Sequence, residues 1–266
     1  MLFKFGKKKI PPVKFGLALG GGGTRGFAHI GVLDELTDAG VDFDVVAGTS
    51  AGSIVGAFYA AGFTCKEMTD ICDELSVRDI LGGGFVPFIS RDPGRVEAFL
   101  DEYLRGATFA HLKKPFYAVS VDLTTGKQVI LNEGSVARAV SASCAIPGVF
   151  RPVVAPDGAH LVDGGLLNNL PSDVARLHGA DKVVAVDVNS TRGRGTDSLH
   201  MLEVVQAVIR IMSVNASLQG RLAADVLLCP ELAEFSSNKK DGYLEMINIG
   251  RRTARENLNS ILALKS

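Results

Sequence analysis

Five residues, Gly48-Thr49-Ser50-Ala51-Gly52, stand between the apolar run Asp44-Val45-Val46-Ala47 and a helix-like segment from Ser53 to Ala61. A strand, a sharp turn with serine at its apex and a helix follow one another here. That order is what a G-x-S-x-G nucleophile elbow requires, because the serine hydroxyl must stand exposed above a sheet. A tight turn with a helix-capping serine is the alternative. In this context the stretch predicts that Ser50 is a nucleophile.

The chain around this stretch alternates between buried strands and helices. Residues 15–19 read as a strand, a glycine-rich loop follows at 20–26, and apolar residues then recur at helical spacing up to Ala39-Gly40. This β-α-β-α beginning implies parallel strands joined by right-handed crossovers, and therefore an α/β protein. Further strands are expected at 116–123, 128–131, 182–188 and 225–229, and further helices at 66–75, 95–104, 135–145, 171–177, 199–218 and 243–264.

The composition limits the class of protein. With 266 residues, 47% of them apolar, the chain is long enough for one large domain. A net charge of −1 provides no field to attract nucleic acid, so we expect no nucleic-acid partner. The four cysteines are scattered, and no histidine stands at metal-ligand spacing, so we expect reduced thiols, no metal and no cofactor. No apolar run approaches the length of a membrane span, which suggests a soluble, cytoplasmic protein.

Three segments outside the elbow allow more than one interpretation. Residues 1–12 carry four lysines and no acid, so they are expected to form a flexible tail ahead of a single domain at 13–266, or a weak peripheral anchor to anionic lipid. Residues 76–90 are apolar and glycine-rich, typical of a buried irregular loop or of a flap over an acyl pocket. The second apolar stripe of the helix at 199–218 indicates deep packing, a homo-oligomer contact or a membrane contact.

The glycine-rich loop has two interpretations. Gly21-x-Gly23-x-x-Gly26 satisfies the dinucleotide-binding pattern, which also needs an acidic residue at the end of the second strand. Here Asp44 stands at the start of that strand and the elbow serine at its end, so nucleotide binding is disfavoured. Consecutive glycines leading into a helix present backbone N–H groups with no side chains in the way, which suits an oxyanion formed during acyl transfer.

A serine nucleophile needs a base, and the residues offer two kinds. A triad in the chain order serine, acid, histidine would use His178 or His200, neither of which lies in a supporting motif. Asp163 stands in Asp163-Gly164-Gly165, an unhindered turn that backbone can approach, although a turn aspartate bonded to its own backbone would look the same. His160 is three residues before Asp163 and would face the opposite side of an extended segment.

Four ordered motifs resemble the patatin-like phospholipases, particularly the short bacterial members. They are G-G-G-x-R-G from Gly21, G-T-S-A-G at the elbow, A-S-C-A-I-P-G-V-F from Ala142 to Phe150, and L-V-D-G-G ending at Gly165. The resemblance runs from about Phe15 to Val188. It implies a three-layer α/β/α fold with a mainly parallel central sheet and the elbow between the second strand and the following helix.

The resemblance also implies a catalytic dyad without histidine, in which Ser50 is the nucleophile and Asp163 its direct base. The backbone of Gly21, Gly22, Gly23 and Thr24 would line the oxyanion hole. Arg25 would hold that loop or meet an anionic head group, and the N–H of Ala51 is the other natural donor. Supporting glycines in these motifs are Gly26, Gly48, Gly52, Gly164 and Gly165. Gly165 stands where other members often have alanine, a small departure.

The predicted function is therefore a serine acyl hydrolase that cleaves carboxylic esters of lipids, either phospholipid or lysophospholipid, through an acyl-enzyme. An aspartate is a weak base for a hydroxyl, so the site must raise the pKa of Asp163 by desolvation. Composition suggests an acyl pocket near Phe85, Val86, Phe88, Ile146 and Phe150. The alternatives are a carboxylesterase or thioesterase acting on soluble acyl esters, and a non-catalytic lipid-binding regulator.

Overall fold

The structure of the chain is a computed structural model that describes residues 13–74, 92–189, 200–235 and 240–265. The basic segment 1–12 and the apolar segment 76–90, for which the sequence allows two interpretations each, lie outside the described residues. All four cysteines lie within them and are free thiols. No helix in the described ranges is both long and apolar enough to cross a membrane.

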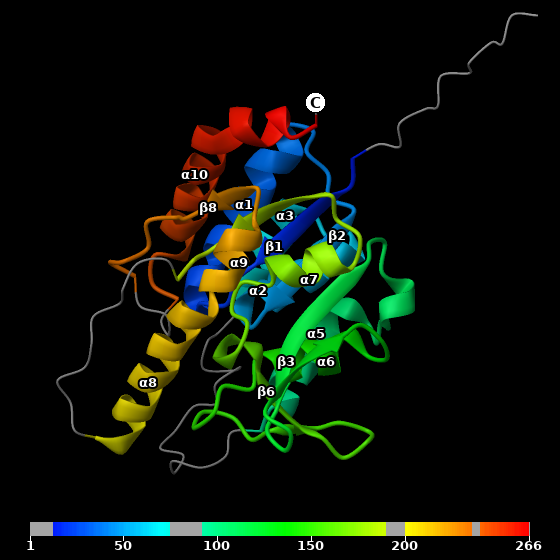
Figure 1. The fold of residues 1–266 in the computed structure, drawn as a ribbon, viewed down its shortest axis with the longest axis vertical. Helices are drawn as coiled ribbons and strands as arrows, with labels where there is room; N and C mark the ends of the chain where they lie inside the picture. Colours follow the sequence, from blue (N-terminus) through cyan, green and yellow to red (C-terminus); the bar gives the residue numbers. More distant parts are fainter. Residues whose placement is uncertain (1–12, 75–91, 190–199, 236–239, 266) are drawn as a thin grey trace, which may run out of the picture.

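A sheet of eight strands organises the described residues (Figure 1). The order is β5-β6-β3-β2-β1-β7-β8, with β4 also paired to β3. Neighbours from β3 through β2, β1 and β7 to β8 are parallel, whereas β4 and β6 pair with β3 antiparallel, and β5 pairs with β6 in the same way. The strands are β1 Phe15–Leu19, β2 Val45–Thr49, β3 Phe116–Asp122, β4 Lys127–Leu131, β5 Val153–Val154, β6 His160–Asp163, β7 Lys182–Val186 and β8 Val226–Leu228.

Within the described residues, each predicted helix is present at its expected place, and one further helix is added. They are α1 Phe27–Asp38, α2 Ala51–Ala61, α3 Cys65–Glu74, α5 Gly94–Leu104, α6 Val136–Ser143, α7 Ser172–Leu177, α8 Met201–Ala216, α9 Leu218–Ala223 and α10 Tyr243–Ala263, with single turns η1 Gly23–Gly26, η2 Phe109–His111 and η3 Gly164–Leu166. The separate α9 was not predicted. Where α8 ends, the carbonyl of Ala216 accepts a hydrogen bond from the Asn169 N–H at 3.3 Å.

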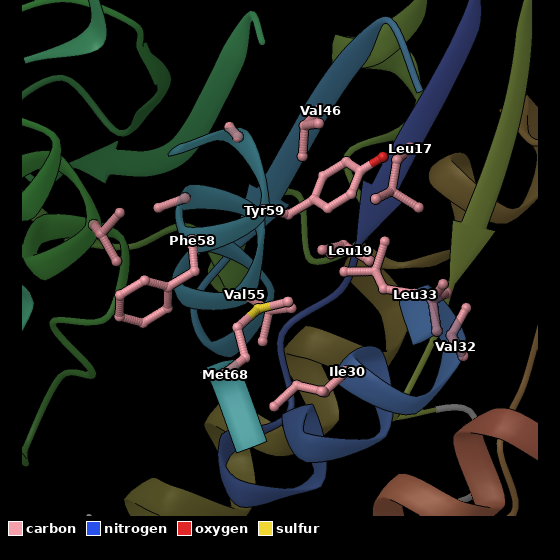
Figure 2. Packing of buried hydrophobic residues seen from close by; sticks show 14 of the residues in the cluster. Leu17, Leu19, Ile30, Val32, Leu33, Val46, Val55, Phe58, Tyr59 and Met68 are labelled. Atoms are coloured by element: carbon pink, nitrogen blue, oxygen red, sulfur yellow. The ribbon is translucent and has the colours of Figure 1, made fainter. Parts of the chain in front are cut away.

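Alternate residues of the buried strands pack on opposite faces of the sheet, which produces three layers. Leu17 and Leu19 of β1 join a large core with α1, α2, α3, α5, α6 and α10, part of which Figure 2 shows. Ala18 joins a smaller core on the other face, where Val174 and Ala175 of α7 pack. The predicted three-layer α/β/α fold with a mainly parallel sheet is confirmed. Small residues on the second face suit the thin layer that α7 and α9 form there.

Helix α8 leaves one of its two apolar stripes uncovered by the described residues. Val204, Val208 and Ile211 are exposed, Ile211 by 63% of its surface. Deep packing of this stripe, the first of the three expectations from the sequence, is therefore wrong. A contact with lipid or with another copy of the chain stays a prediction.

Helices α1 and α10 lie side by side (Figure 1) and touch through two glycines. A β-carbon at Gly31 would overlap the carbonyl oxygen of Ile247, and one at Gly250 would overlap that of Ala28. The glycines therefore let the C-terminal helix approach the backbone of the helix that follows the glycine loop. This contact anchors the C-terminal helix to α1.

We expect Gly31→Ala to destabilise the protein by about 1–3 kcal/mol, because the added methyl group meets backbone that cannot move aside. In a helix without such a contact the same change would stabilise by about 0.5–1 kcal/mol. Urea unfolding followed by circular dichroism measures the difference. Ser260→Ala, on the exposed side of α10, is the control and should change stability by less than about 0.5 kcal/mol. A Gly31→Ala protein as stable as the wild type would contradict the close contact.

Candidate active site

Ser50 stands at a strained turn between β2 and α2, as the elbow motif predicts. Its backbone has φ 52° and ψ −125°, a conformation that costs about 1–3 kcal/mol for a residue other than glycine. A β-carbon at Gly48 would lie 2.6 Å from the carbonyl oxygen of Gly52, and one at Gly52 would overlap the carbonyl of Leu19. Glycine is required at both places because the strand, the turn and the helix approach so closely.

Asp163 ends β6 and lies beside Ser50. Its Oδ1 accepts a hydrogen bond from the N–H of Gly165 at 2.8 Å, and the side chain of Ser50 also hydrogen-bonds to the carboxyl group. Burial raises the pKa of Asp163 from 3.8 to about 6, against the opposing effect of these two hydrogen bonds. The two predicted catalytic residues are thus in contact, and Asp163 ionises close to neutral pH.

The end of helix α6 holds both of these residues in place. The Oγ of Ser143 accepts the N–H of Ser50 at 2.9 Å and donates to the carbonyl of Val119 in β3 at 2.6 Å. Two residues later, the carbonyl of Ala145 accepts the N–H of Asp163 at 3.0 Å. The segment Ser143-Cys144-Ala145 therefore fixes the backbone of the nucleophile and of the carboxylate at once.

The glycine loop lies against Ser50, as predicted, but its backbone N–H groups differ in whether a protein group accepts a hydrogen bond from them. The N–H of Gly21 donates to the carbonyl of Asn169 at 3.0 Å, and the side-chain amide of Asn169 donates back to the carbonyl of Gly21 at 3.2 Å. Gly21 is thereby bound within the fold. Among the described residues, no group accepts a hydrogen bond from the N–H of Gly22, Gly23 or Ala51, so these three remain available to an oxyanion.

A buried histidine supports the start of this loop. His29 in α1 is fully buried, and its Nε2 lies 2.8 Å from the carbonyl oxygen of Gly20. Because a carbonyl only accepts, the proton of the neutral ring must be on Nε2. Burial lowers the pKa of His29 to about 4, so the ring stays neutral where Asp163 is ionised.

Arg25 fixes the glycine loop to the distant parts of the chain. It is buried in η1, its Nε donates to the carbonyl of Phe235 at 3.0 Å, and its Nη1 to Oδ1 of Asn189 at 3.3 Å. Burial, and secondarily repulsion by Arg210, lowers the pKa of Arg25. The resemblance implies that Arg25 either holds the glycine loop or meets an anionic head group. These hydrogen bonds match the first role.

A cavity of about 530 Å³ opens beside Ser50 and Asp163. Gly21, Gly22, Gly23, Thr24, Gly26 and Ala51 line it near the two catalytic candidates. Its apolar wall comes from α2, α3 and α5 and includes Val55, Phe58, Met68, Ile71, Val96 and Phe99. Ile146 and Phe150, which the sequence suggested for an acyl pocket, also line the cavity, whereas Phe85, Val86 and Phe88 lie outside the described residues.

No histidine of the described chain lines this cavity. His178, at the end of α7, stacks on Tyr117 with ring centres 3.8 Å apart, and His200 is exposed ahead of α8. His111 lies in η2 beside Thr108, and His160 is exposed on β6. Within the same residues, no cluster of three or more His, Cys, Asp or Glu is arranged to hold a metal ion.

Several residues at the site were not singled out from the sequence. Ser143 and Cys144 lay in a recognised motif, but nothing in that motif assigns a hydrogen bond to either. Cys144 is buried beside Ser50, Ser53 and Asp163, and burial followed by the charge of Asp163 raises the pKa of its thiol, so it stays protonated. Helix α8 also lines the cavity, with Gln206, Ile209, Arg210 and Ser213. Helical spacing places Gln206, Arg210 and Ser213 on a polar stripe and Ile209 on an apolar one, but nothing in the sequence assigns either stripe to the site.

Known proteins resemble this chain both in sequence and in fold. Over 187 residues it is 40% identical to an uncharacterized NTE family protein of Mycobacterium tuberculosis, which covers 69% of this chain and 32% of the relative. Over 187 residues it is 38% identical to patatin-like phospholipase domain-containing protein 6 of Homo sapiens, covering 65% of this chain and 13% of that protein. The matches thus span about a third or less of these longer relatives.

A solved structure has the same fold. VipD from Legionella pneumophila superposes with a TM-score of 0.53 at 15% sequence identity, over 94% of this chain and 67% of VipD. Residues 17–176, more than half of the chain, match the family model described as patatin-like phospholipase. The chain therefore belongs to the patatin-like phospholipase family.

Proposed function

We propose that this protein is a serine acyl hydrolase that cleaves the carboxylic ester bonds of phospholipids or lysophospholipids. One observation supports it above the others. Ser50 and Asp163 hydrogen-bond to each other beside a cavity of about 530 Å³ with a mainly apolar lining. Such a cavity is of the size that small-molecule ligands fill, and its aliphatic and aromatic lining suits an acyl chain.

The reaction begins with attack of the Ser50 Oγ on the ester carbonyl carbon, while the hydroxyl proton passes to the Asp163 carboxylate. The raised pKa of Asp163, about 6, makes it a stronger base than an exposed aspartate, and it is still ionised at neutral pH. The strained elbow presents the hydroxyl to the cavity in a fixed direction. No third residue is needed to orient the base, because the N–H of Gly165 already holds Oδ1 of the carboxylate.

The negative charge that forms on the ester oxygen needs hydrogen-bond donors. Gly22, Gly23 and Ala51 line the cavity, and no described group accepts a hydrogen bond from their N–H groups. Helix α2 begins at Ala51, so the positive end of its dipole adds to these donors. Removal of one such donor in other enzymes costs about 3–4 kcal/mol of transition-state stabilisation. Collapse of the intermediate breaks the bond to the alcohol, which takes the proton from Asp163.

The acyl group is then attached to Ser50 through an ester bond. A water molecule attacks this ester, giving its proton to Asp163, and the second tetrahedral intermediate collapses to release the fatty acid. The proton returns to the Ser50 oxygen. Asp163 therefore acts as base and acid in turn in both half-reactions.

We expect Ser50→Ala to abolish both ester hydrolysis and labelling by a fluorophosphonate, because the nucleophile is gone. Asp163→Asn should lower kcat by about 10²–10⁴, the usual contribution of a general base. Hydrolysis of p-nitrophenyl butyrate and of lysophosphatidylcholine measures both changes. Asp157→Asn, in an exposed turn, is the matched control and should keep full activity.

Other outcomes would point to other chemistry. Labelling that survives in Ser50→Ala would rule out the nucleophile, and loss of activity in His178→Ala or His200→Ala would indicate a triad. Hydrolysis of the butyrate ester alone would favour the soluble carboxylesterase alternative. A wild-type protein that takes neither the label nor either ester would favour a non-catalytic lipid-binding protein.

Activity should depend on pH through Asp163. Its folded-state pKa is raised to about 6, so kcat/KM should rise with pH, bend near pH 6 and level off above it. Below the bend, each pH unit should cost about tenfold, because only the ionised carboxylate is a base. Initial rates on p-nitrophenyl butyrate from pH 4.5 to 8.5 give the profile, with circular dichroism to confirm folding at each pH. A profile without a bend near pH 6 would contradict the assignment of Asp163 as base.

Ser143 should matter for catalysis although it does not reach the substrate. We expect Ser143→Ala to release the Ser50 N–H and lower kcat by about 10–100-fold, as misplacement of a catalytic group does. Ser141→Ala is the matched control on α6, because Ser141 is also buried and its Oγ donates to the carbonyl of Pro93 at 2.7 Å. Both variants should lose similar stability in thermal unfolding. Equal kcat in the two proteins would show that Ser143 has only a structural role.

A further inference from the structure

One side of the active-site cavity differs in chemistry from the rest. Helix α8 contributes Gln206, Arg210 and Ser213, spaced so that they lie on one face of the helix, whereas the wall from α2, α3 and α5 is apolar. Asn189, which follows β7, lines the same polar side. The cavity therefore has an apolar region and a polar region, with Ser50 among its lining residues.

Helix α8 is fixed close to the catalytic turn. A β-carbon at Gly165 would lie 3.2 Å from the Oγ of Ser213, so this part of α8 touches the backbone that holds the Asp163 carboxylate. Arg210 precedes Ser213 by three residues, about 4.5 Å along the helix axis. Arg210 lines the same cavity as Ser50 and Asp163.

The charge of Arg210 is not neutralised by the described protein. Asp163 and Arg210 are the only residues with a carboxylate, ammonium or guanidinium group among those that the structure shows lining the cavity. Asp163 is not the partner of Arg210, because no ion pair or hydrogen bond joins the two among the described residues. No ion pair of Arg210 occurs in the described chain, whereas Arg221, on the next helix, pairs with Asp187 at 2.6 Å.

A second guanidinium makes this region more positive still. Arg25 lies close enough to Arg210 for repulsion to lower its pKa, and two of its five N–H groups donate to the carbonyl of Phe235 and to Oδ1 of Asn189. Arg25 is therefore held within the fold. Two guanidinium groups, neither of which forms an ion pair within the described residues, make a region that attracts an anion.

We propose that Arg210 binds the phosphate group of a glycerophospholipid while the scissile ester lies at Ser50 and the acyl chain in the apolar region. This assignment rests on the proposed function. It makes the preferred substrate a lipid with a phosphodiester close to the ester, rather than a neutral acylglycerol. A guanidinium suits this task because its planar N–H groups can bind two phosphate oxygens at once, and the amides of Gln206 and Asn189 offer further uncharged donors.

The test compares two substrates that share an acyl chain and differ in phosphate. 1-Palmitoyl lysophosphatidylcholine and 1-palmitoyl glycerol are presented in the same uncharged detergent micelles, and kcat/KM is measured for each. The specificity ratio is kcat/KM for lysophosphatidylcholine divided by kcat/KM for palmitoyl glycerol. We expect Arg210→Gln to reduce this ratio by about 10–100-fold, mostly through a higher KM for lysophosphatidylcholine, because a charged hydrogen bond is lost. Arg210→Lys should reduce the ratio less, because lysine keeps the positive charge but lacks the planar pair of N–H donors. Arg252→Gln, exposed on α10, is the matched control and should keep the wild-type ratio.

An unchanged ratio in Arg210→Gln would overturn the proposal, and so would an equal loss on both lipids. If the wild type cleaves p-nitrophenyl butyrate through Ser50 but neither lipid, the lipid function fails separately. Glycerol 3-phosphate and inorganic phosphate are then tested as inhibitors of butyrate hydrolysis. Competitive inhibition that is lost in Arg210→Gln would support the anion site. If glycerol 3-phosphate and inorganic phosphate inhibit equally, the site recognises the phosphate group and not the glycerol. Absence of inhibition in the wild type would overturn it.

Discussion

The active site depends on one short segment that bonds to the backbone of both catalytic candidates. Ser143 accepts the N–H of Ser50, and the carbonyl of Ala145 accepts the N–H of Asp163. Ser50 follows the end of β2 and Asp163 ends β6, more than a hundred residues later, so no local preference of the chain could align them. Ser143 is itself bonded to Val119 in the central sheet. The positions of Ser50 and Asp163 are therefore both fixed relative to that sheet. The strained turn at Ser50 persists because this network stabilises it.

The reactivity of Asp163 results from a balance between burial and two hydrogen bonds. Burial raises its pKa, and a carboxyl that is protonated cannot accept a proton. The bonds from Ser50 and from the Gly165 N–H act in the opposite direction. The result, about 6, lies close to the value at which a base is both strong and ionised. His29, which bonds to the carbonyl of Gly20 at the start of the glycine loop, is held neutral by its burial.

The sequence predicted those parts of the site that local motifs encode. The elbow at Ser50, the glycine loop and the turn at Asp163 each combine strand, glycine and helix signals within a few residues, and the structure brings all three together. From the residues alone the choice between Asp163 and a histidine stayed open, and the family resemblance favoured the aspartate. The sequence could not predict the contacts of Asn169, nor that Arg210 lines the cavity. Helical periodicity shows that a helix has an apolar face and a polar one, but only the packed structure shows which element or cavity each face meets.

The family match ends at residue 176, whereas α8 begins at Met201. Ser50, Asp163 and the glycine loop, which we assign to bond cleavage, are therefore encoded in one continuous stretch, and the polar wall of the cavity is encoded downstream of it. Such a division makes the molecule modular. Mutations in α8 could alter which lipid is accepted without disturbing the hydrogen bonds that position Ser50, so substrate range could diverge faster than chemistry. For protein engineering, our proposal for Arg210 makes a transplanted α8 a compact means of testing whether head-group preference moves with this helix.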